Sequence, residues 1–174
     1  MILGSNNGNT TITGINFERK VSLLTSFTLL PNYTIQTPVN RIGNEILHNN
    51  VLVARNFKKH QFYSFLDEQN INWKNVLSKK LLPDDVLLIN NTLSIFEVKF
   101  QQTSGSTDEK LQTCDFKYKQ YKKLLNNNFE LKYIYILNDW FKKIEYKDVL
   151  QYITDNNCNY YFNTISLSNL KIPD

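Results

Sequence analysis

Acidic residues and a lysine interrupt the most apolar stretch of the sequence, LLPDDVLLINNTLSIFEVKF, residues 81–100. Asp84 and Asp85 stand at its entrance, and Glu97 and Lys99 lie near its end. The runs DVLLI and LSIFEVKFQ have the composition of two β-strands, and NNT between them favours a tight turn. Such a hairpin brings Asp84, which begins the first strand, toward Glu97 and Lys99. Two carboxylates and an ammonium group are therefore expected to converge at one end of the hairpin.

The polar residues of the second strand have two interpretations. Side chains alternate along a strand, so Glu97, Lys99 and Gln101 are expected on one face. That face is either the wet side of an edge strand or a site. As a site, its carboxylates suit Mg²⁺, with Mn²⁺ able to substitute, because these ions prefer oxygen ligands. A lysine beside the metal can orient a water or neutralise charge on a phosphate, so the group favours phosphodiester hydrolysis.

Length and composition indicate one folded domain. The chain has 174 residues, of which 41% are hydrophobic and 13% aromatic, enough for a packed core. No run reaches the roughly 20 apolar residues of a membrane span, and no signal peptide is recognisable. Two cysteines without metal or redox spacing favour the cytoplasm. Residues 1–13 are small and polar and are expected to form a loose start.

The expected elements alternate between helices and strands. Pro38 should end the strand of YTIQTPV early or place it at a sheet edge, and residues 40–56 are ambiguous, with a possible strand at NNVLVA. The other expected elements are helices within residues 14–30, 57–69, 73–82, 106–125 and 146–153, and strands within 131–137 and 158–163, besides the hairpin. This order predicts an α/β domain with a mixed central β-sheet flanked by helices.

Lysines are concentrated in the helix expected at residues 106–125. They are Lys110, Lys117, Lys119, Lys122 and Lys123. Lys110 and Lys117 share a stripe with Tyr121, and the other three lie on a neighbouring face. The net charge of +4 is only mildly basic. The lysines therefore either contact DNA phosphates or simply solvate the helix, and the pattern favours neither.

These motifs together resemble a known signature. PDDVLLI followed by FEVK is similar to the motif of the PD-(D/E)XK nuclease superfamily, with Asp84, Glu97 and Lys99 in the named roles. Asp85 is the alternative to Asp84 as a metal ligand. Glu18 in NFERK matches a glutamate that the superfamily often carries on the preceding helix, and would assist with a second metal or its water. The resemblance implies a restriction-endonuclease-like core, with one nuclease domain spanning residues 1–174.

The segment that begins with EVKFQQ is most similar to type II restriction endonucleases. The resemblance implies a Mg²⁺-dependent endonuclease that cuts double-stranded DNA, or the catalytic subunit of one, and Gln101 is expected to contact the DNA together with the lysines. One site per chain favours a homodimer on a symmetric target, and the small size also allows a heterodimer with a recognition subunit. Two alternatives remain: a structure-specific or repair nuclease such as a junction resolvase, and a non-catalytic DNA-binding module whose acidic pair is structural.

Overall fold

A mixed β-sheet runs through the molecule in the order of the chain, from β1 at one edge to β7 at the other. The computed structural model describes residues 16–105 and 107–173, so the loose start expected at residues 1–13 lies outside it. Neighbours from β1 to β5 are antiparallel, whereas β5, β6 and β7 are parallel. The strands are β1 (Tyr33–Gln36), β2 (Asn44–His48), β3 (Val51–Phe57), β4 (Asp85–Ile89), β5 (Thr92–Lys99), β6 (Glu130–Leu137) and β7 (Cys158–Phe162).

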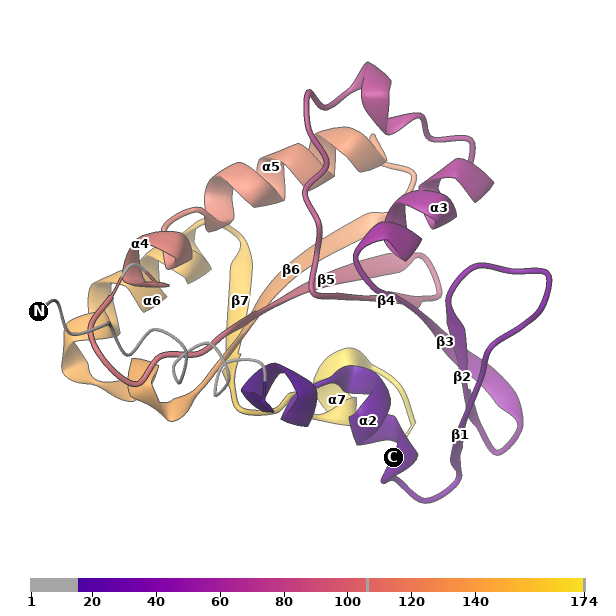
Figure 1. The fold of residues 1–174 in the computed structure, drawn as a ribbon, viewed down its shortest axis with the longest axis horizontal. Helices are drawn as coiled ribbons and strands as arrows, with labels where there is room; N and C mark the ends of the chain where they lie inside the picture. The colour runs from indigo at the N-terminus through magenta and orange to yellow at the C-terminus, as the bar shows by residue number, and fades with distance from the viewer. Residues whose placement is uncertain (1–15, 106, 174) are drawn as a thin grey trace, which may run out of the picture.

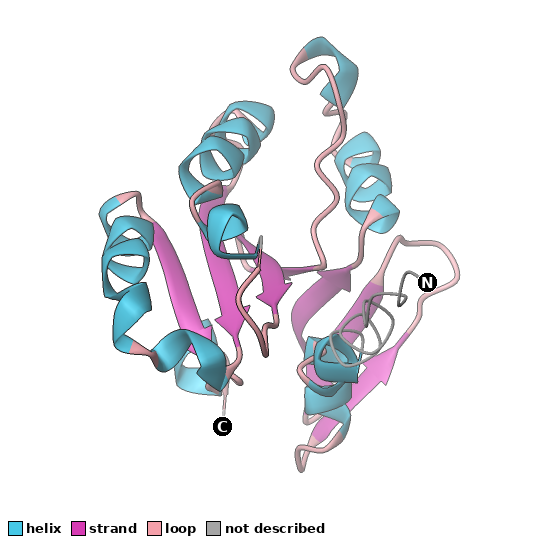
Figure 2. Cartoon of the chain, turned by 60° about the vertical axis from the view of Figure 1, so that its left-hand side comes forward, coloured by secondary structure: helices cyan, strands magenta, loops and turns pink. Residues whose placement is uncertain are grey.

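Helices cover both faces of this sheet (Figures 1 and 2). They are α2 (Leu23–Thr28), α3 (His60–Glu68), α4 (Thr107–Leu111), α5 (Cys114–Leu125), α6 (Lys147–Asp155) and α7 (Leu167–Leu170), besides a helical turn at residues 16–20. The α3, α5 and α6 helices pack on one face, and α2 and α7 on the other. The expected α/β class with a mixed, helix-flanked sheet is confirmed. None of the described helices has the length and apolar character to cross a bilayer.

Alternate residues of β5 enter two separate cores. Leu93 and Ile95 face the core under α3, α5 and α6, whereas Phe96 faces the core under α2 and α7. All three side chains are at most 1% exposed. Because β5 has neighbours on both sides, it lies inside the sheet. The interpretation of its polar face as the wet side of an edge strand is therefore wrong.

The ambiguous residues 40–56 form the hairpin of β2 and β3. Asn49 and Asn50 connect the strands with φ angles of 50° and 64°, and His48 pairs with Val51. Asparagine tolerates this left-handed conformation, which the tightest hairpin turns require. Three strands, β1, β2 and β3, therefore precede α3. The sequence clearly indicated only one of them. That strand, β1, lies at the edge and ends before Pro38, as expected.

The single helix expected within residues 14–30 is interrupted. Ser22 has an extended conformation (ψ 126°) between the turn at residues 16–20 and α2. The backbone N–H of Leu23, at the start of α2, donates to the Asp85 carboxylate. A distant carboxylate thus satisfies a free helix-terminal donor, which compensates for the break.

The long basic helix expected at residues 106–125 is divided into α4 and α5. The Thr113 hydroxyl donates to the Lys110 carbonyl at 2.7 Å, and the Tyr135 hydroxyl also reaches this carbonyl, at 3.3 Å. These bonds satisfy the Lys110 carbonyl oxygen, which in a longer helix would accept from the backbone N–H four residues later. The two helices can therefore take different directions (Figure 1).

The helix expected at residues 73–82 shrinks to a 3-10 turn, η1 (Trp73–Asn75). Beyond it, Leu81 is held by side chains: its N–H donates to the Tyr63 hydroxyl at 2.8 Å, and its carbonyl accepts from Tyr63 and Tyr121 at 2.9 and 3.0 Å. Two aromatic side chains from α3 and α5 thereby fix an extended segment that leads directly to Asp84. The short α7 helix was not expected from the sequence.

Candidate active site

The hairpin of β4 and β5 brings Asp84, Glu97 and Lys99 together. Asp85 pairs with Phe96, so Asp84 lies beside Glu97 on the next rung. The Val98 N–H donates to Asp84 Oδ2 at 2.8 Å, which fixes that carboxylate against β5. Lys99 Nζ lies 2.8 Å from Glu97 Oε2 and 3.9 Å from Asp84 Oδ2. The three side chains named by the sequence motif therefore form one connected ionic group.

This group lies at the end of β5 and the start of β4, where exposure to solvent increases. The residues before it on the same face of β5, Leu93 and Ile95, are fully buried. The Glu97 side chain is still only 6% exposed, but Lys99 is 15% and Asp84 25% exposed. The group is thus largely desolvated and yet open to a ligand, which strengthens its electrostatic interactions.

Oxygen atoms surround the Lys99 ammonium group from three residues. They are Glu97 Oε2 at 2.8 Å, the Val98 carbonyl oxygen at 3.1 Å and Asp84 Oδ2 at 3.9 Å. Within residues 16–105 and 107–173, no three His, Cys, Asp or Glu side chains form a metal-binding group. Two carboxylates and a carbonyl converging on one cation nevertheless fit Mg²⁺, which takes oxygen ligands and keeps several waters.

Glu97 is held by two lysines. Besides Lys99 at Oε2, Lys117 on α5 places its Nζ 3.0 Å from Oε1. Burial alone would raise the pKa of Glu97, but the two ammonium groups outweigh it and lower the pKa below its ordinary value. Glu97 is therefore ionised at neutral pH despite its burial.

Asp84 has a different balance of charges. Burial raises its pKa above the ordinary value; Lys99 opposes this shift, and the carboxylates of Glu97 and Glu18 add to it. A site crowded with carboxylates is one that an added cation would stabilise. The geometry and charge of Asp84 are thus consistent with a cation ligand.

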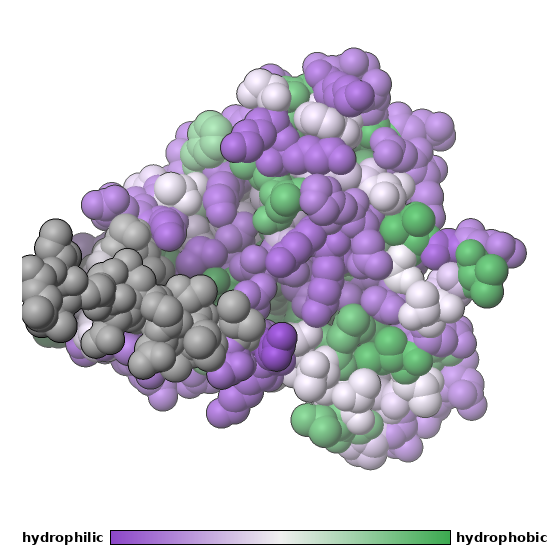
Figure 3. All heavy atoms as spheres, viewed as in Figure 1, coloured by the Kyte–Doolittle hydropathy of each residue, from purple (hydrophilic) through white to green (hydrophobic). Residues whose placement is uncertain are grey.

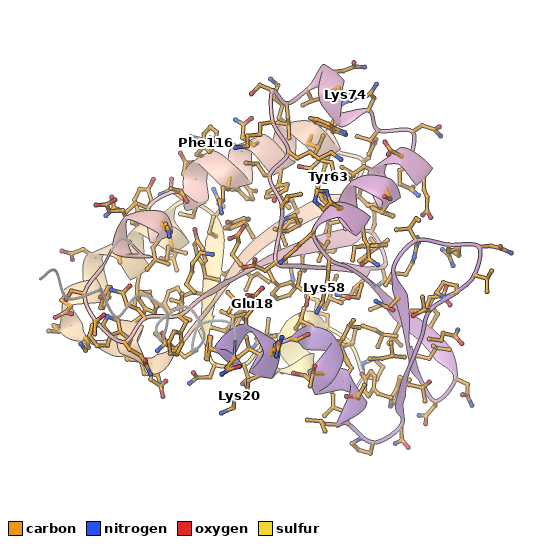
Figure 4. The ribbon with its side chains drawn as sticks, viewed as in Figure 1. Glu18, Lys20, Lys58, Tyr63, Lys74 and Phe116 are labelled. Carbon is orange, nitrogen blue, oxygen red and sulfur yellow. The ribbon has the colours of Figure 1, made fainter. Side chains whose placement is uncertain are left out.

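Glu18 lies on the helical turn at residues 16–20, close enough to influence Asp84. The Phe17 ring packs against Phe100 with centroids 5.2 Å apart, which attaches this turn to the segment after β5. Glu18, Lys58, Asp84 and Asp85 all line one cavity of about 30 Å³, which is large enough to hold a water molecule. Figure 4 shows Glu18 on the side of the turn that faces the strands, with Lys20 on the opposite side.

Asp85, the alternative ligand, points to the α2 face of the sheet. Its carboxylate accepts hydrogen bonds from the Asn56 side chain and from the N–H groups of Val86 and Leu23. The residue is 5% exposed, and burial raises its pKa to about 6 against the effects of these donors and of Lys58. Structural hydrogen bonds occupy this carboxylate, which favours Asp84 as the cation ligand.

The lysines expected to contact DNA fall into two groups. Lys117 faces the site, whereas Lys110, Lys119, Lys122 and Lys123 are exposed. Lys119 pairs with Asp115 at 2.8 Å on the same helix. None of these four exposed lysines forms an ion pair with Asp84 or Glu97 in the described residues, so any contact they make with DNA is outside the carboxylate group.

Gln101 lies beyond the end of β5, so strand alternation does not place it on the face of Glu97. Its backbone N–H and carbonyl bond to the Asn138 side chain at 3.0 and 2.9 Å. The side chain is buried, and within the described residues neither atom of its amide has a hydrogen-bond partner. The predicted contact of Gln101 with DNA therefore has no exposed donor or acceptor in this geometry.

Sequence reasoning missed two contributors to the site and named a third, Lys117, only as a possible DNA contact. The Val98 carbonyl and Lys58 give no side-chain pattern that could reveal them. Lys117 did give a signal: it occurs at the spacing of Cys114 and Tyr121, which are both buried on α5. A lysine on the apolar face of a helix is the one most directed toward the interior.

Comparison with known proteins adds no relative to this picture. No protein-family model matches the chain, and neither a curated protein nor a solved structure is significantly similar to it. The function therefore has to be argued from the site alone.

Proposed function

We propose that this protein is a Mg²⁺-dependent endonuclease that hydrolyses phosphodiester bonds in double-stranded DNA. We further propose a type II restriction endonuclease, or its catalytic subunit, working in the cytoplasm. The observation that carries the proposal is the Lys99 ammonium group enclosed by oxygens of Glu97, Val98 and Asp84 at the open end of two central strands. Two carboxylates and a lysine are the groups that metal-assisted hydrolysis requires.

Asp84, Glu97 and the Val98 carbonyl would hold the metal, and Mn²⁺ can take the place of Mg²⁺. When bound, the metal supplies Lewis acidity toward the phosphate and lowers the pKa of a coordinated water. Glu18, across the small cavity from Asp84, would bind a second metal or one of its waters. The carboxylate of Glu97 is already ionised, so it needs no proton removal before it can act as a ligand.

Lys99 supplies a mobile positive charge at the reacting centre. Its ammonium group has alternative oxygen partners within 4 Å, so it can leave the carboxylates for a phosphate oxygen without leaving the site. There it would orient the attacking water or stabilise the charge that accumulates as phosphorus becomes pentacoordinate. The partly buried position strengthens this effect.

The surface around the site suits a polyanion. Figure 3 shows mostly hydrophilic residues over the upper part of this face, where α3, α5 and the segment between α3 and β4 lie. Residues 69–83 in that segment carry Lys74, Lys79 and Lys80 and no acidic residue. Lys80 stacks over the Tyr63 ring with its Nζ 4.7 Å from the centroid, which helps to fix the segment. These lysines, with those on α5, would contact DNA phosphates.

Duplex DNA has two antiparallel strands related by two-fold symmetry, and the described part of the chain offers one such site. A homodimer would place one site on each strand, and a heterodimer would add a separate recognition subunit. Either assembly is part of the proposal.

The test incubates the purified protein with linear duplexes and with branched four-way junctions, in Mg²⁺, Ca²⁺ or EDTA. We expect discrete fragments from linear duplex in Mg²⁺, suppression in Ca²⁺ and no cutting in EDTA. Cutting only at branches would identify a structure-specific nuclease, and binding without cutting a DNA-binding module. Glu97→Gln serves as the matched control because it keeps the side-chain shape; undiminished cleavage by this variant would exclude the proposed metal site.

A further inference from the structure

Each oxygen of the Glu97 carboxylate has its own lysine. Lys99 lies 2.8 Å from Oε2 and comes from the same strand, whereas Lys117 lies 3.0 Å from Oε1 and comes from α5. The motif of the strand hairpin accounts for Lys99 only. Lys117 is thus a second ammonium group at the same carboxylate, delivered by a different element.

The position of Lys117 on α5 sets it apart from the other lysines of that helix. It follows Cys114 and precedes Tyr121, which are both fully buried, so it lies on the inward side. Its side chain is 25% exposed, compared with 68% for Lys119, whose partner is Asp115 on the same helix. The Lys117 ammonium group can therefore reach both Glu97 and a ligand that enters from solvent.

The four charged groups nearest to Glu97 already balance one another without a ligand, with Glu18 as a further carboxylate across the small cavity. Asp84 and Glu97 contribute two negative charges, and Lys99 and Lys117 contribute two positive ones, all within direct contact distances. A divalent cation bound to these carboxylates adds two positive charges to a largely buried group. The lysines then need another anion, and the anion that a nucleic acid brings is the phosphodiester.

We infer that Lys117 is a second lysine of the active site, which exchanges Glu97 for a non-bridging oxygen of the phosphate when substrate and metal are bound. This inference rests on the proposed nuclease function. In the free protein Lys117 competes with the metal for Glu97; in the complex it stabilises negative charge on the phosphate. Its removal therefore has two effects of opposite sign, one on metal binding and one on cleavage.

The first measurement is Mn²⁺ binding to the protein without DNA, by isothermal titration calorimetry. Replacing Lys117 with Gln removes a positive charge next to the metal ligand, so Mn²⁺ should bind roughly tenfold more tightly. Lys117→Arg keeps the charge and should bind Mn²⁺ like the parent. Lys119→Gln is the matched control: it removes the same charge from the outward side of α5 and should leave Mn²⁺ affinity unchanged.

The second measurement is the single-turnover cleavage rate at saturating Mn²⁺ and DNA. Lys117→Gln should be slower by on the order of 100-fold, the effect of losing one donor to a developing phosphate charge. Lys117→Arg should recover part of this loss. Tighter Mn²⁺ binding combined with slower cleavage is a pattern that neither a structural role nor a DNA contact remote from the site produces. Thermal melting of each variant checks that it is folded, and Lys117→Met repeats the test with an apolar side chain.

The outcomes separate this inference from the proposed function. A parent that cleaves DNA, together with a Lys117→Gln variant of parental cleavage rate, overturns the second-lysine role and leaves the nuclease intact. Weaker Mn²⁺ binding by Lys117→Gln also overturns it, because Lys117 would then only orient Glu97. A parent that neither binds Mn²⁺ nor cleaves DNA overturns the proposed function and this inference with it.

Discussion

Asp84 and Asp85 are adjacent in the sequence and line the same small cavity, but their carboxylates have contrasting partners. Asp84 accepts one backbone hydrogen bond, from Val98, and lies 3.9 Å from the ammonium group of Lys99. Asp85 is buried, and Asn56 and backbone N–H groups donate to its carboxylate. Asp84 precedes β4, and its carboxylate is held by β5, whereas the carboxylate of Asp85 is held by β3 and by the start of α2.

The difference shows that two adjacent carboxylates can have separate roles, one available to bind a ligand and the other holding the fold. The neighbours of Asp84 are charged and partly exposed, so its environment can change when a ligand binds. The neighbours of Asp85 are fixed hydrogen-bond donors, one of which begins α2. Asp85 thereby connects β4 to α2, the helix that follows the turn carrying Glu18, and helps to hold that turn next to the site.

The largest expected effect is on cleavage by Asp84 and Glu97 variants. Asp84→Asn and Glu97→Gln each remove a proposed metal ligand and should reduce the single-turnover cleavage rate by on the order of a thousandfold. Asp85→Asn should retain cleavage within roughly tenfold of the parent, because its carboxylate is committed to hydrogen bonds. If Asp85→Asn is the more damaged variant when folded, the two roles have been assigned in the wrong order.

Lys99 is expected to give the next largest effect. Lys99→Ala removes the charge between the carboxylates and should slow cleavage by on the order of 100-fold while the fold persists, because the side chain is outside both apolar cores. Circular dichroism checks the fold, and single-turnover kinetics the rate. Parental cleavage by a folded Lys99→Ala protein would contradict the proposed role.

Asp85 should instead govern stability as a function of pH. Its pKa of about 6 in the folded protein lies above the ordinary 3.8, so the folded state holds the proton more tightly. The free energy of unfolding should therefore fall by about 3 kcal/mol from this residue in total, as pH rises from well below the ordinary pKa to well above the folded one, with most of the loss between the two values.

Urea unfolding at several pH values measures this contribution as the difference between the parent and Asp85→Asn. Asparagine does not ionise, so the difference should change most steeply between pH 4 and 6 and level off about one pH unit beyond either side of this window. A difference that does not vary with pH would show that Asp85 has an ordinary pKa and that its buried network has been misjudged.

The smallest effects are expected on the outward face of α5. Single changes of Lys119, Lys122 or Lys123 to Ala should weaken binding to any DNA sequence in Ca²⁺ and lower the slope of log affinity against log salt by roughly one unit per lost contact. Cleavage at saturating protein should persist, because these side chains do not touch the carboxylates. Unchanged affinity and slope for all three would mean that this face is only solvated.

The hairpin with its three charged residues could be predicted because everything that defines it is local. Asp84 and Lys99 are joined by one strand, a short turn and another strand, so alternation and turn chemistry fix which side chains meet. The helix boundaries could not be predicted in the same way. Ser22 and Thr113 are compatible with helix, and the breaks there are stabilised by partners distant in sequence, Asp85 and Tyr135.

The sequence by itself therefore determined the alternating α/β pattern, the strand pair and the meeting of Asp84, Glu97 and Lys99. Tertiary structure decided which carboxylate of the acidic pair is committed to hydrogen bonds and that Lys117 reaches Glu97. The physical reason is that strand alternation acts over neighbouring residues. The direction of a helix, and the buried partner that each of its side chains meets, depend on packing between elements far apart in the chain.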